Sequence, residues 1–371
     1  GRAGWSEERA HYDLTINADH PDHRALAGHF GLAPLVPDDD APGPSVIDGQ
    51  LRQHQGGDWI IGGNVKLGPT SITGRLTHQD MSAEKGKWEA RISIGNPRND
   101  SLAPFFALIG HRSTGNWTPR SILGRLPTTA IRTAWLDDVD GSLSMVARGG
   151  LAGEGINISA RLEKGFLYVD EFEADLWKGN LSAEISLERR REQPFASMAI
   201  ELDDIDAEAL TDWLGIPKTI EGPLKLKLEA ASVGQTVFDL VKGLSGNINL
   251  EMEQGQLHST GVPVLRRTLR NNLDARLQTP NSPADPLTMS LSNLGVTGTL
   301  KRGVATLDEG SFTFDPSLGF DATASINGTL DLLLWIAELT MDITTDDDEM
   351  TPLALRIIGP PSRPQGLFTA P

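Results

Sequence analysis

The sequence predicts a mostly β protein, built as one elongated, strongly curved antiparallel sheet with a few short helices. Three observations predict this fold class. Apolar and polar residues alternate with period two in many short segments, which is typical of strands because successive side chains point to opposite faces. Turn residues separate these segments at intervals of roughly 10 to 15 residues, as in antiparallel meanders. A five-residue unit centred on glycine also recurs within the alternating pattern.

The alternating segments each predict a strand with one apolar and one polar face. The clearest runs from Leu224 to Leu228, where leucine and lysine take turns. In chain order, the expected strands include 156–158, 181–187, 224–228, 247–252, 311–314 and 321–326.

The recurring unit has isoleucine or valine in first place, glycine in third place and leucine in fifth place. Glycine inside a strand lowers its stability and usually marks a bulge, a bend or close approach of another backbone. Repeated bends predict a sheet that is curved rather than flat. The unit occurs six times, centred on Gly49, Gly74, Gly141, Gly222, Gly298 and Gly328.

Longer matching blocks indicate an internal repeat. The block from Asp22 to Leu32 is similar to that from Asp206 to Ile216, and one of the glycine units follows each. We therefore expect repeat units at about 10–80 and 196–262, followed by C-terminal strands in 263–371 that close the sheet. No linker is evident, so residues 1–371 are expected to form a single elongated domain.

Helical patterns are few. Short helices are expected at Asp22–Phe30, Ala207–Leu214 and Thr236–Leu244, which have the capping residues that helix ends prefer. Val262–Leu277 predicts the longest helix, with leucines on one side and arginines on the other. We interpret that cationic side as a solvated helix face, with contact to lipid headgroups as the alternative.

Composition excludes several classes of protein. The 33 basic and 50 acidic residues give a net charge of −17, which argues against a nucleic-acid partner. The absence of cysteine excludes disulfides, thiolate catalysis and cysteine-ligated metals. No apolar run reaches the roughly 20 residues that span a bilayer. Because the chain starts abruptly at Gly1, we expect a soluble fragment whose membrane anchor lies upstream.

Motifs for catalysis, phosphate binding or metal binding are missing, so we expect no enzyme activity, no cofactor and no metal. Three acidic or histidine-containing clusters have simpler interpretations. Asp19–His23 is expected to cap a helix, Asp137–Asp140 to lie in a strand turn and Asp346–Glu349 to form a solvated hairpin tip. Asp203 and Asp204 are adjacent in a predicted strand, so they are expected to point to opposite faces and not to share a substrate.

Several segments resemble the AsmA family of bacterial envelope proteins, which includes the TamB type. The similarity is carried by Ile205–Gly215 and by Val237–Gly246 leading to the turn at Gly255. The final Ile357–Pro364 is similar to the closing pattern of the family, although Pro360 stands where that pattern has threonine.

This resemblance implies a bridge-like β-groove, shaped like a taco, in a periplasmic protein tethered to the inner membrane by an N-terminal helix absent from this fragment. It implies that the groove holds phospholipid or other acyl lipid for transport between the inner and outer membranes. A role in outer-membrane homeostasis follows, with other envelope proteins as possible partners.

Strand parity suggests which side chains line such a groove. An error of one residue in any strand would reverse its assignment. An envelope scaffold that docks partner proteins without carrying lipid remains the alternative function. The candidate lining residues are Ile156, Ile158, Leu167, Val169, Leu224, Leu226, Leu228, Ile248, Leu250, Phe312 and Phe314.

Overall fold

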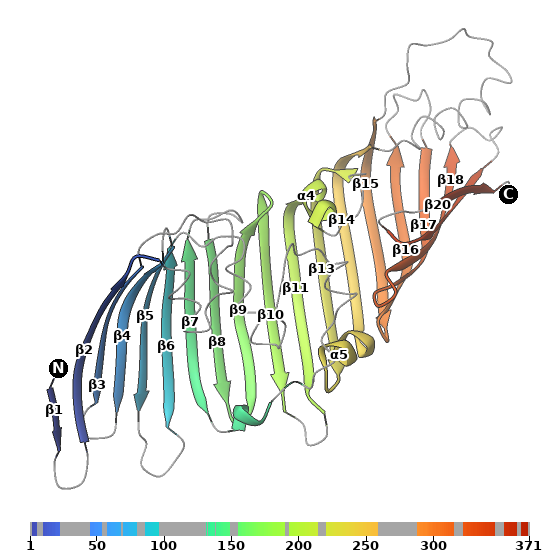
Figure 1. The fold of residues 1–371 in the computed structure, drawn as a ribbon. Helices are drawn as coiled ribbons and strands as arrows, with labels where there is room; N and C mark the ends of the chain where they lie inside the picture. Colours follow the sequence, from blue (N-terminus) through green and yellow to red (C-terminus); the bar gives the residue numbers. More distant parts are fainter. Residues whose placement is uncertain are drawn as a thin grey trace.

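The described residues form one sheet of 20 strands in the computed structural model. The strands lie side by side in chain order along an elongated, curved ribbon, except that β12 pairs with β14 and β11 pairs directly with β13 (Figure 1). The two termini lie at opposite ends (Figure 1). The end strands are β1, which pairs with β2, and β20, which pairs with β19. Because β1 and β20 do not pair with each other, the sheet stays open. The predicted fold class is confirmed. The structure describes residues 2–5, 10–22, 45–53, 58–67, 70–79, 86–95, 131, 133–137, 139–148, 155–189, 193–213, 220–258, 288–314, 322–345, 352–361 and 365–369.

The strands are mostly about ten residues long, and the helices are short. The N-terminal strands are β1 (Arg2–Trp5), β2 (Ala10–His20), β3 (Ser45–Gln53), β4 (Trp59–Leu67), β5 (Thr70–Gln79) and β6 (Lys87–Gly95). The central strands are β7 (Asp140–Arg148), β8 (Gly155–Glu163), β9 (Phe166–Leu176), β10 (Gly179–Glu188), β11 (Phe195–Asp206), β12 (Ile220–Glu221), β13 (Pro223–Val233) and β14 (Ser245–His258). The C-terminal strands are β15 (Thr288–Lys301), β16 (Val304–Phe314), β17 (Ala322–Asp331), β18 (Ile336–Thr345), β19 (Leu353–Gly359) and β20 (Gln365–Thr369).

One strand pair departs from the expected antiparallel pattern. β6 and β7 pair in parallel, with Lys87 opposite Asp140 and Gly95 opposite Arg148. A parallel pair needs a crossover of a dozen or more residues, and the intervening residues 96–139 provide that length. The sheet is therefore mixed, which the alternating pattern alone did not reveal.

Three of the six glycine units coincide with irregular backbone. Gly222 and Gly328 have φ angles of 138° and 140°, which favour glycine because a side chain would be strained there. Gly298 lies at a register shift between β15 and β16. These positions fit the predicted bends.

The other three glycines lie in continuous register. Gly49 and Gly74 are flanked by regular antiparallel pairs, and Gly141 by regular parallel pairs. Regular pairing excludes a bulge at these three units. At Gly141 the reason for glycine is close approach, because an added Cβ would lie 2.4 Å from the carbonyl oxygen of Trp88.

Two of the predicted helices are confirmed. α4 (Ala207–Trp213) begins after Asp206, whose carboxylate accepts a hydrogen bond from the Glu208 amide at 3.0 Å. α5 (Val237–Gly243) begins with a capping box in which Thr236 and Asp239 bond each other's backbone amides. A 3-10 turn, η3 (Ala134–Asp137), precedes β7. The helices expected at 22–30 and 262–277 lie outside the described residues.

The most densely packed part of the molecule lies between β13 and β18, next to α4. Phe312 and Phe314 are 5% and 2% exposed there, and their rings pack edge to face with centroids 4.8 Å apart. Leu224, Met252 and Ile343 belong to the same cluster. Elsewhere the sheet has smaller clusters on one face, so packing is concentrated toward the C-terminal half.

Candidate functional site

An unbroken row of apolar residues crosses the sheet from β2 to β20. Residues directly opposite each other on neighbouring strands lie on the same face, so a chain of direct pairs follows one face across the molecule. This central row has one residue on each of eighteen strands, β12 being the strand that it misses. Its members are Ile16, Gly49, Gly63, Gly74, Ile92, Met145, Ile158, Phe172, Ala183, Ile200, Leu228, Ile248, Gly298, Leu307, Gly328, Leu339, Ile357 and Gly366.

A second row runs from β2 to β16 on the same face, two residues along each strand except on β16, where a register shift makes the offset three. It is also connected by direct pairs and is also entirely apolar. Together the two rows define what we call the apolar face, and neither contains a lysine, arginine, aspartate or glutamate. The second row consists of Ala18, Ile47, Val65, Ile72, Ile94, Ala147, Ile156, Ala174, Leu181, Leu202, Leu226, Leu250, Val296 and Gly310.

The row between these two faces the other way and is almost entirely polar. It defines the polar face of the sheet, and a single valine interrupts it. Its residues are Asn17, Asp48, Asn64, Thr73, Ser93, Val146, Asn157, Glu173, Ser182, Glu201, Lys227, Asn249, Thr297 and Glu309.

The two faces differ in exposure to solvent. Most of the polar row is exposed, whereas most of the apolar face is only partly exposed. Within the described ranges no second sheet covers the apolar face, since every strand belongs to the same sheet. The sheet is therefore open, with one apolar and one polar face, and this arrangement is consistent with a groove.

All eleven predicted lining residues lie on the side of the sheet that carries the apolar face, although Leu167, Val169, Leu224, Phe312 and Phe314 stand outside its two rows. Six of them are partly exposed, namely Ile156, Leu167, Leu226, Leu228, Ile248 and Leu250. The other five are buried in the packed clusters, namely Ile158, Val169, Leu224, Phe312 and Phe314. Strand parity therefore placed these side chains on one side of the sheet, but it did not separate the partly exposed positions from the buried ones, and their role as a lipid lining stays a prediction.

None of the lining residues predicted from sequence precedes β8, although the apolar face begins at β2. The glycine unit could have revealed this part, because residues one, three and five of a strand share a face. In β3 and β5 that unit places Gly49 and Gly74 on the apolar face, and Gly63 of β4 lies between them. These three glycines form a strip without side chains across neighbouring strands.

Asp203 and Asp204 do not point to opposite faces as expected. The register between β11 and β13 shifts between Leu202 and Ile205, which leaves both aspartates in a bulge. Their carboxylates approach the same ammonium group, Lys225 Nζ, at 3.2 and 3.9 Å. This pairing raises the pKa of Lys225, chiefly through its hydrogen bond to Asp203. The bulge explains the error, because the extra residue breaks the alternation.

Ion pairs between neighbouring strands extend along the polar face. Lys227 lies 3.3 Å from Glu201, and Arg161 lies 2.9 Å from Asp170. Such exposed pairs each contribute at most about 1 kcal/mol. Their main consequence is that this face is charged and well hydrated.

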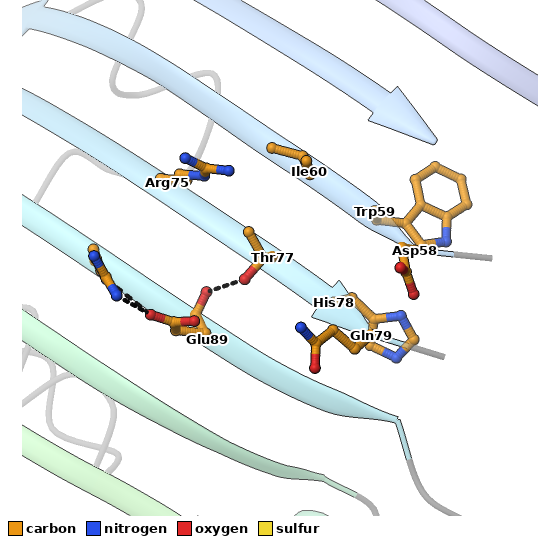
Figure 2. A pocket seen from close by; sticks show the side chains of 9 residues that line it. Asp58, Trp59, Ile60, Arg75, Thr77, His78, Gln79 and Glu89 are labelled. Atoms are coloured by element: carbon orange, nitrogen blue, oxygen red, sulfur yellow. Dashed lines mark hydrogen bonds and ion pairs between the residues drawn. The ribbon is translucent and has the colours of Figure 1, made fainter. Parts of the chain in front are cut away.

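A shallow hollow on the polar face lies across β4, β5 and β6 (Figure 2). Its lining includes Ile60, Arg75 and Thr77, and the Thr77 hydroxyl donates to the Glu89 carbonyl at 3.4 Å. Arg91 pairs with the Glu89 carboxylate at 2.6 Å. Glu89 is thus engaged by both Thr77 and Arg91, whereas His78 Nδ1 in the same lining is buried without a hydrogen-bond partner among the described residues.

The three acidic or histidine-containing clusters make local interactions in their described parts. His20 Nδ1 is within hydrogen-bond distance of the backbone of Asp22, and Asp140 accepts the Lys164 amide at 2.8 Å. Asp137 pairs with Arg189. In the described part of the chain, no group of three or more His, Cys, Asp or Glu residues is placed to hold a metal ion. Residues 346–349 lie outside the described residues.

No helix among the described residues is long and apolar enough to cross a membrane. The AsmA family model matches residues 123–309, which is just over half of the chain. No curated protein and no solved structure matches the chain. The match covers the central strands that carry the apolar face, and it fits an envelope-associated protein. The chain belongs to the AsmA family.

Proposed function

We propose that this chain is a periplasmic lipid-binding and lipid-transfer protein, tethered to the inner membrane in its full-length form. Its apolar face would hold phospholipid acyl chains for transport between the inner and outer membranes and so serve outer-membrane homeostasis. The observation that carries this proposal is the central row from Ile16 to Gly366, which crosses eighteen strands without a polar side chain. Membership of the AsmA family supports an envelope location.

The energetics favour this use of the apolar face. Moving an acyl chain of 16 carbons into water costs on the order of 13 kcal/mol, at about 0.8 kcal/mol per methylene group. A face as apolar as the bilayer interior removes most of that cost without binding the lipid tightly. Since shielding from water is all that is needed, the proposed function involves no catalytic group and no cofactor.

The size of the sheet also fits. Twenty strands spaced about 4.8 Å apart extend over about 90 Å, a useful fraction of the distance between two membranes. A lipid tail moving from strand to strand along the central row would meet no lysine, arginine, aspartate or glutamate. Partial exposure matters as well, because a fully buried face would have no room for a ligand.

An envelope scaffold is the second candidate function. Each end strand, β1 and β20, has a single strand neighbour among the described residues. A free strand edge can accept a strand from a partner protein. In that case the apolar face would serve the stability of the sheet and would carry no lipid.

Native mass spectrometry with lipid extraction tests the proposal. The chain would be purified from bacterial membranes without harsh detergent, alongside a Leu226→Asp, Ile248→Asp double variant. We expect phospholipid in stoichiometric amounts on the unaltered chain and its loss from the double variant. The matched control is Lys227→Asp with Asn249→Asp, which alters the same two strands on the polar face. Lipid-free protein with an intact fold would refute lipid binding and favour the scaffold.

A further inference from the structure

Exposed apolar side chains gather along one edge of the sheet, where β13, β15, β16, β17 and β18 begin or end. Seven large apolar residues are prominently exposed in the described part of the chain, and four of them belong to this edge. Leu334 is the most exposed of all, at 69%, and Ile336 beside it is 44% exposed. Val233 at the end of β13 and Phe238 of α5 complete the group. The β17–β18 turn therefore presents leucine and isoleucine to solvent where turns usually present polar residues.

The turn that carries these side chains is well fixed. The Asp331 carboxylate accepts the amides of Leu333 and Leu334 at 2.9 and 2.8 Å. Leu332, which precedes Leu333 in the chain, packs against the buried cluster that contains Leu300 and Ala305. The exposed tip is thus joined directly to the packed apolar side of the sheet, and two hydrogen bonds to Asp331 stabilise its turn.

Three cations lie next to this tip. Backbone hydrogen bonds connect Leu332 to Gly303 and Gly303 to Leu244, at 2.9 and 3.0 Å, so the β15–β16 turn lies between the tip and α5. That turn exposes Lys301 and Arg302.

The third cation is Lys242 of α5, which is also exposed. An added Cβ on Gly303 would lie 3.4 Å from the Cα of Lys242, so the β15–β16 turn and the helix are in contact. No carboxylate in the described part of the chain is paired with Lys242, Lys301 or Arg302.

Two acids of the same edge, Asp239 and Asp331, accept hydrogen bonds from their own segments. Asp239 bonds the amide and hydroxyl of Thr236 at the start of α5, and Asp331 holds the hairpin turn. The cations are therefore free to meet an external anion, although the chain as a whole carries a charge of −17. We call Lys242, Lys301, Arg302, Leu334 and Ile336 the edge patch.

We propose that the edge patch docks onto the surface of a bilayer containing anionic phospholipid, and that lipid tails reach the apolar face there. The cations would meet headgroup phosphates while Leu334 and Ile336 insert among the acyl chains. Leu332 and Leu300 then continue the apolar path onto the sheet. The transfer step rests on the proposed function, whereas bilayer binding can be measured without it.

Vesicle sedimentation tests the docking. The 371-residue chain would be mixed with vesicles of phosphatidylethanolamine and phosphatidylglycerol, and separately with phosphatidylcholine vesicles. We expect binding to the anionic vesicles that weakens with salt. Each cation near an anionic membrane contributes about fivefold in binding, so Lys242→Glu, Lys301→Glu and Arg302→Glu together should weaken binding at least about 100-fold. The control is Lys66→Glu, Arg75→Glu and Lys87→Glu, the same charge change on β4, β5 and β6.

The apolar half of the patch has its own variant. Leu334→Ser should weaken vesicle binding about tenfold, and Val46→Ser, at an exposed valine of the polar face, should leave it unchanged. Unaltered vesicle binding by the charge-reversed triple variant would overturn the proposal. The proposal would also be overturned if the chain bound no vesicles but formed a dimer that Leu334→Ser abolishes. The patch would then bind a second copy of the chain.

The two proposals fail in distinguishable ways. If the purified chain contains lipid but the triple variant still sediments with vesicles, the edge patch is not the docking site and the lipid-binding function stands. If the patch binds vesicles but the chain contains no lipid, bilayer docking stands and lipid transfer falls.

Discussion

Two leucines of one strand separate the packed part of the apolar face from its open part. Leu224 and Leu226 are two residues apart in β13 and share a face. Leu224 is 5% exposed and belongs to the cluster with Met252 and Phe312. Leu226 is only partly buried and lies between Leu202 and Leu250 in the second row. The same substitution at the two positions should therefore have different costs.

The magnitudes follow from burial. Leu224→Ala should lower the free energy of unfolding by about 2–5 kcal/mol, because a buried leucine loses its transfer energy and leaves a cavity. Leu226→Ala should cost about 1 kcal/mol. Full burial of a leucine contributes about 1.5–3 kcal/mol, and a partly exposed one forfeits only part of that and leaves no closed cavity.

Equilibrium urea unfolding followed by far-ultraviolet circular dichroism measures both variants. Because both leucines belong to β13, they report on the same cooperative unit, and the urea dependence of unfolding should not differ between them. If Leu226→Ala lowered the free energy of unfolding as much as Leu224→Ala does, the assignment of Leu226 to an open part of the apolar face would be wrong. It would mean that the supposedly open face is covered in the folded protein and has no room for a ligand.

Three further predictions concern the framework of the sheet. Gly141→Ala should destabilise the parallel pair by at least about 1 kcal/mol, since the new Cβ would lie 2.4 Å from the carbonyl of Trp88; unchanged urea stability would contradict this. Thr236→Ala should cost about 1 kcal/mol by removing the cap of α5, with Thr236→Ser as the variant that retains stability. Asp206 has a pKa below its ordinary value, chiefly because Lys178 donates a hydrogen bond to it. The Asp206 carboxylate therefore stabilises the folded state above about pH 4, and this stabilisation is lost as the pH falls further. The stability difference between the unaltered chain and Asp206→Asn should accordingly be largest at neutral pH and shrink in acid, and a difference that grows in acid would contradict the ion pair.

Much of the fold followed from sequence because alternation is a local property. The alternation from Leu224 to Leu228 indicates a strand whichever strands lie beside it. Once β11 and β14 pair with this strand, residues directly opposite each other point to the same face. The two helices were visible for the same reason, since Asp206 and Thr236 are caps that act within one turn.

Features that depend on distant parts of the chain were not visible. The parallel pair of β6 and β7 joins strands that residues 96–139 separate in the sequence, so no local pattern reveals it. The bulge at Asp203 and Asp204 is a mismatch between two strands, so it cannot be read from one. Burial of Phe312 and Phe314 likewise depends on which strands crowd together, and parity alone could not separate these side chains from Leu226.

If this chain carries lipid as proposed, lipid tails contact one face of the sheet and not the other. Site-specific photo-crosslinking can distinguish the faces, with a photoreactive amino acid placed singly at positions 226, 227, 228, 248 and 249 in cells. We expect crosslinks to lipid at Leu226, Leu228 and Ile248 and none at Lys227 or Asn249, a period of two along each strand. Equal crosslinking on both faces, or none on either, would contradict it.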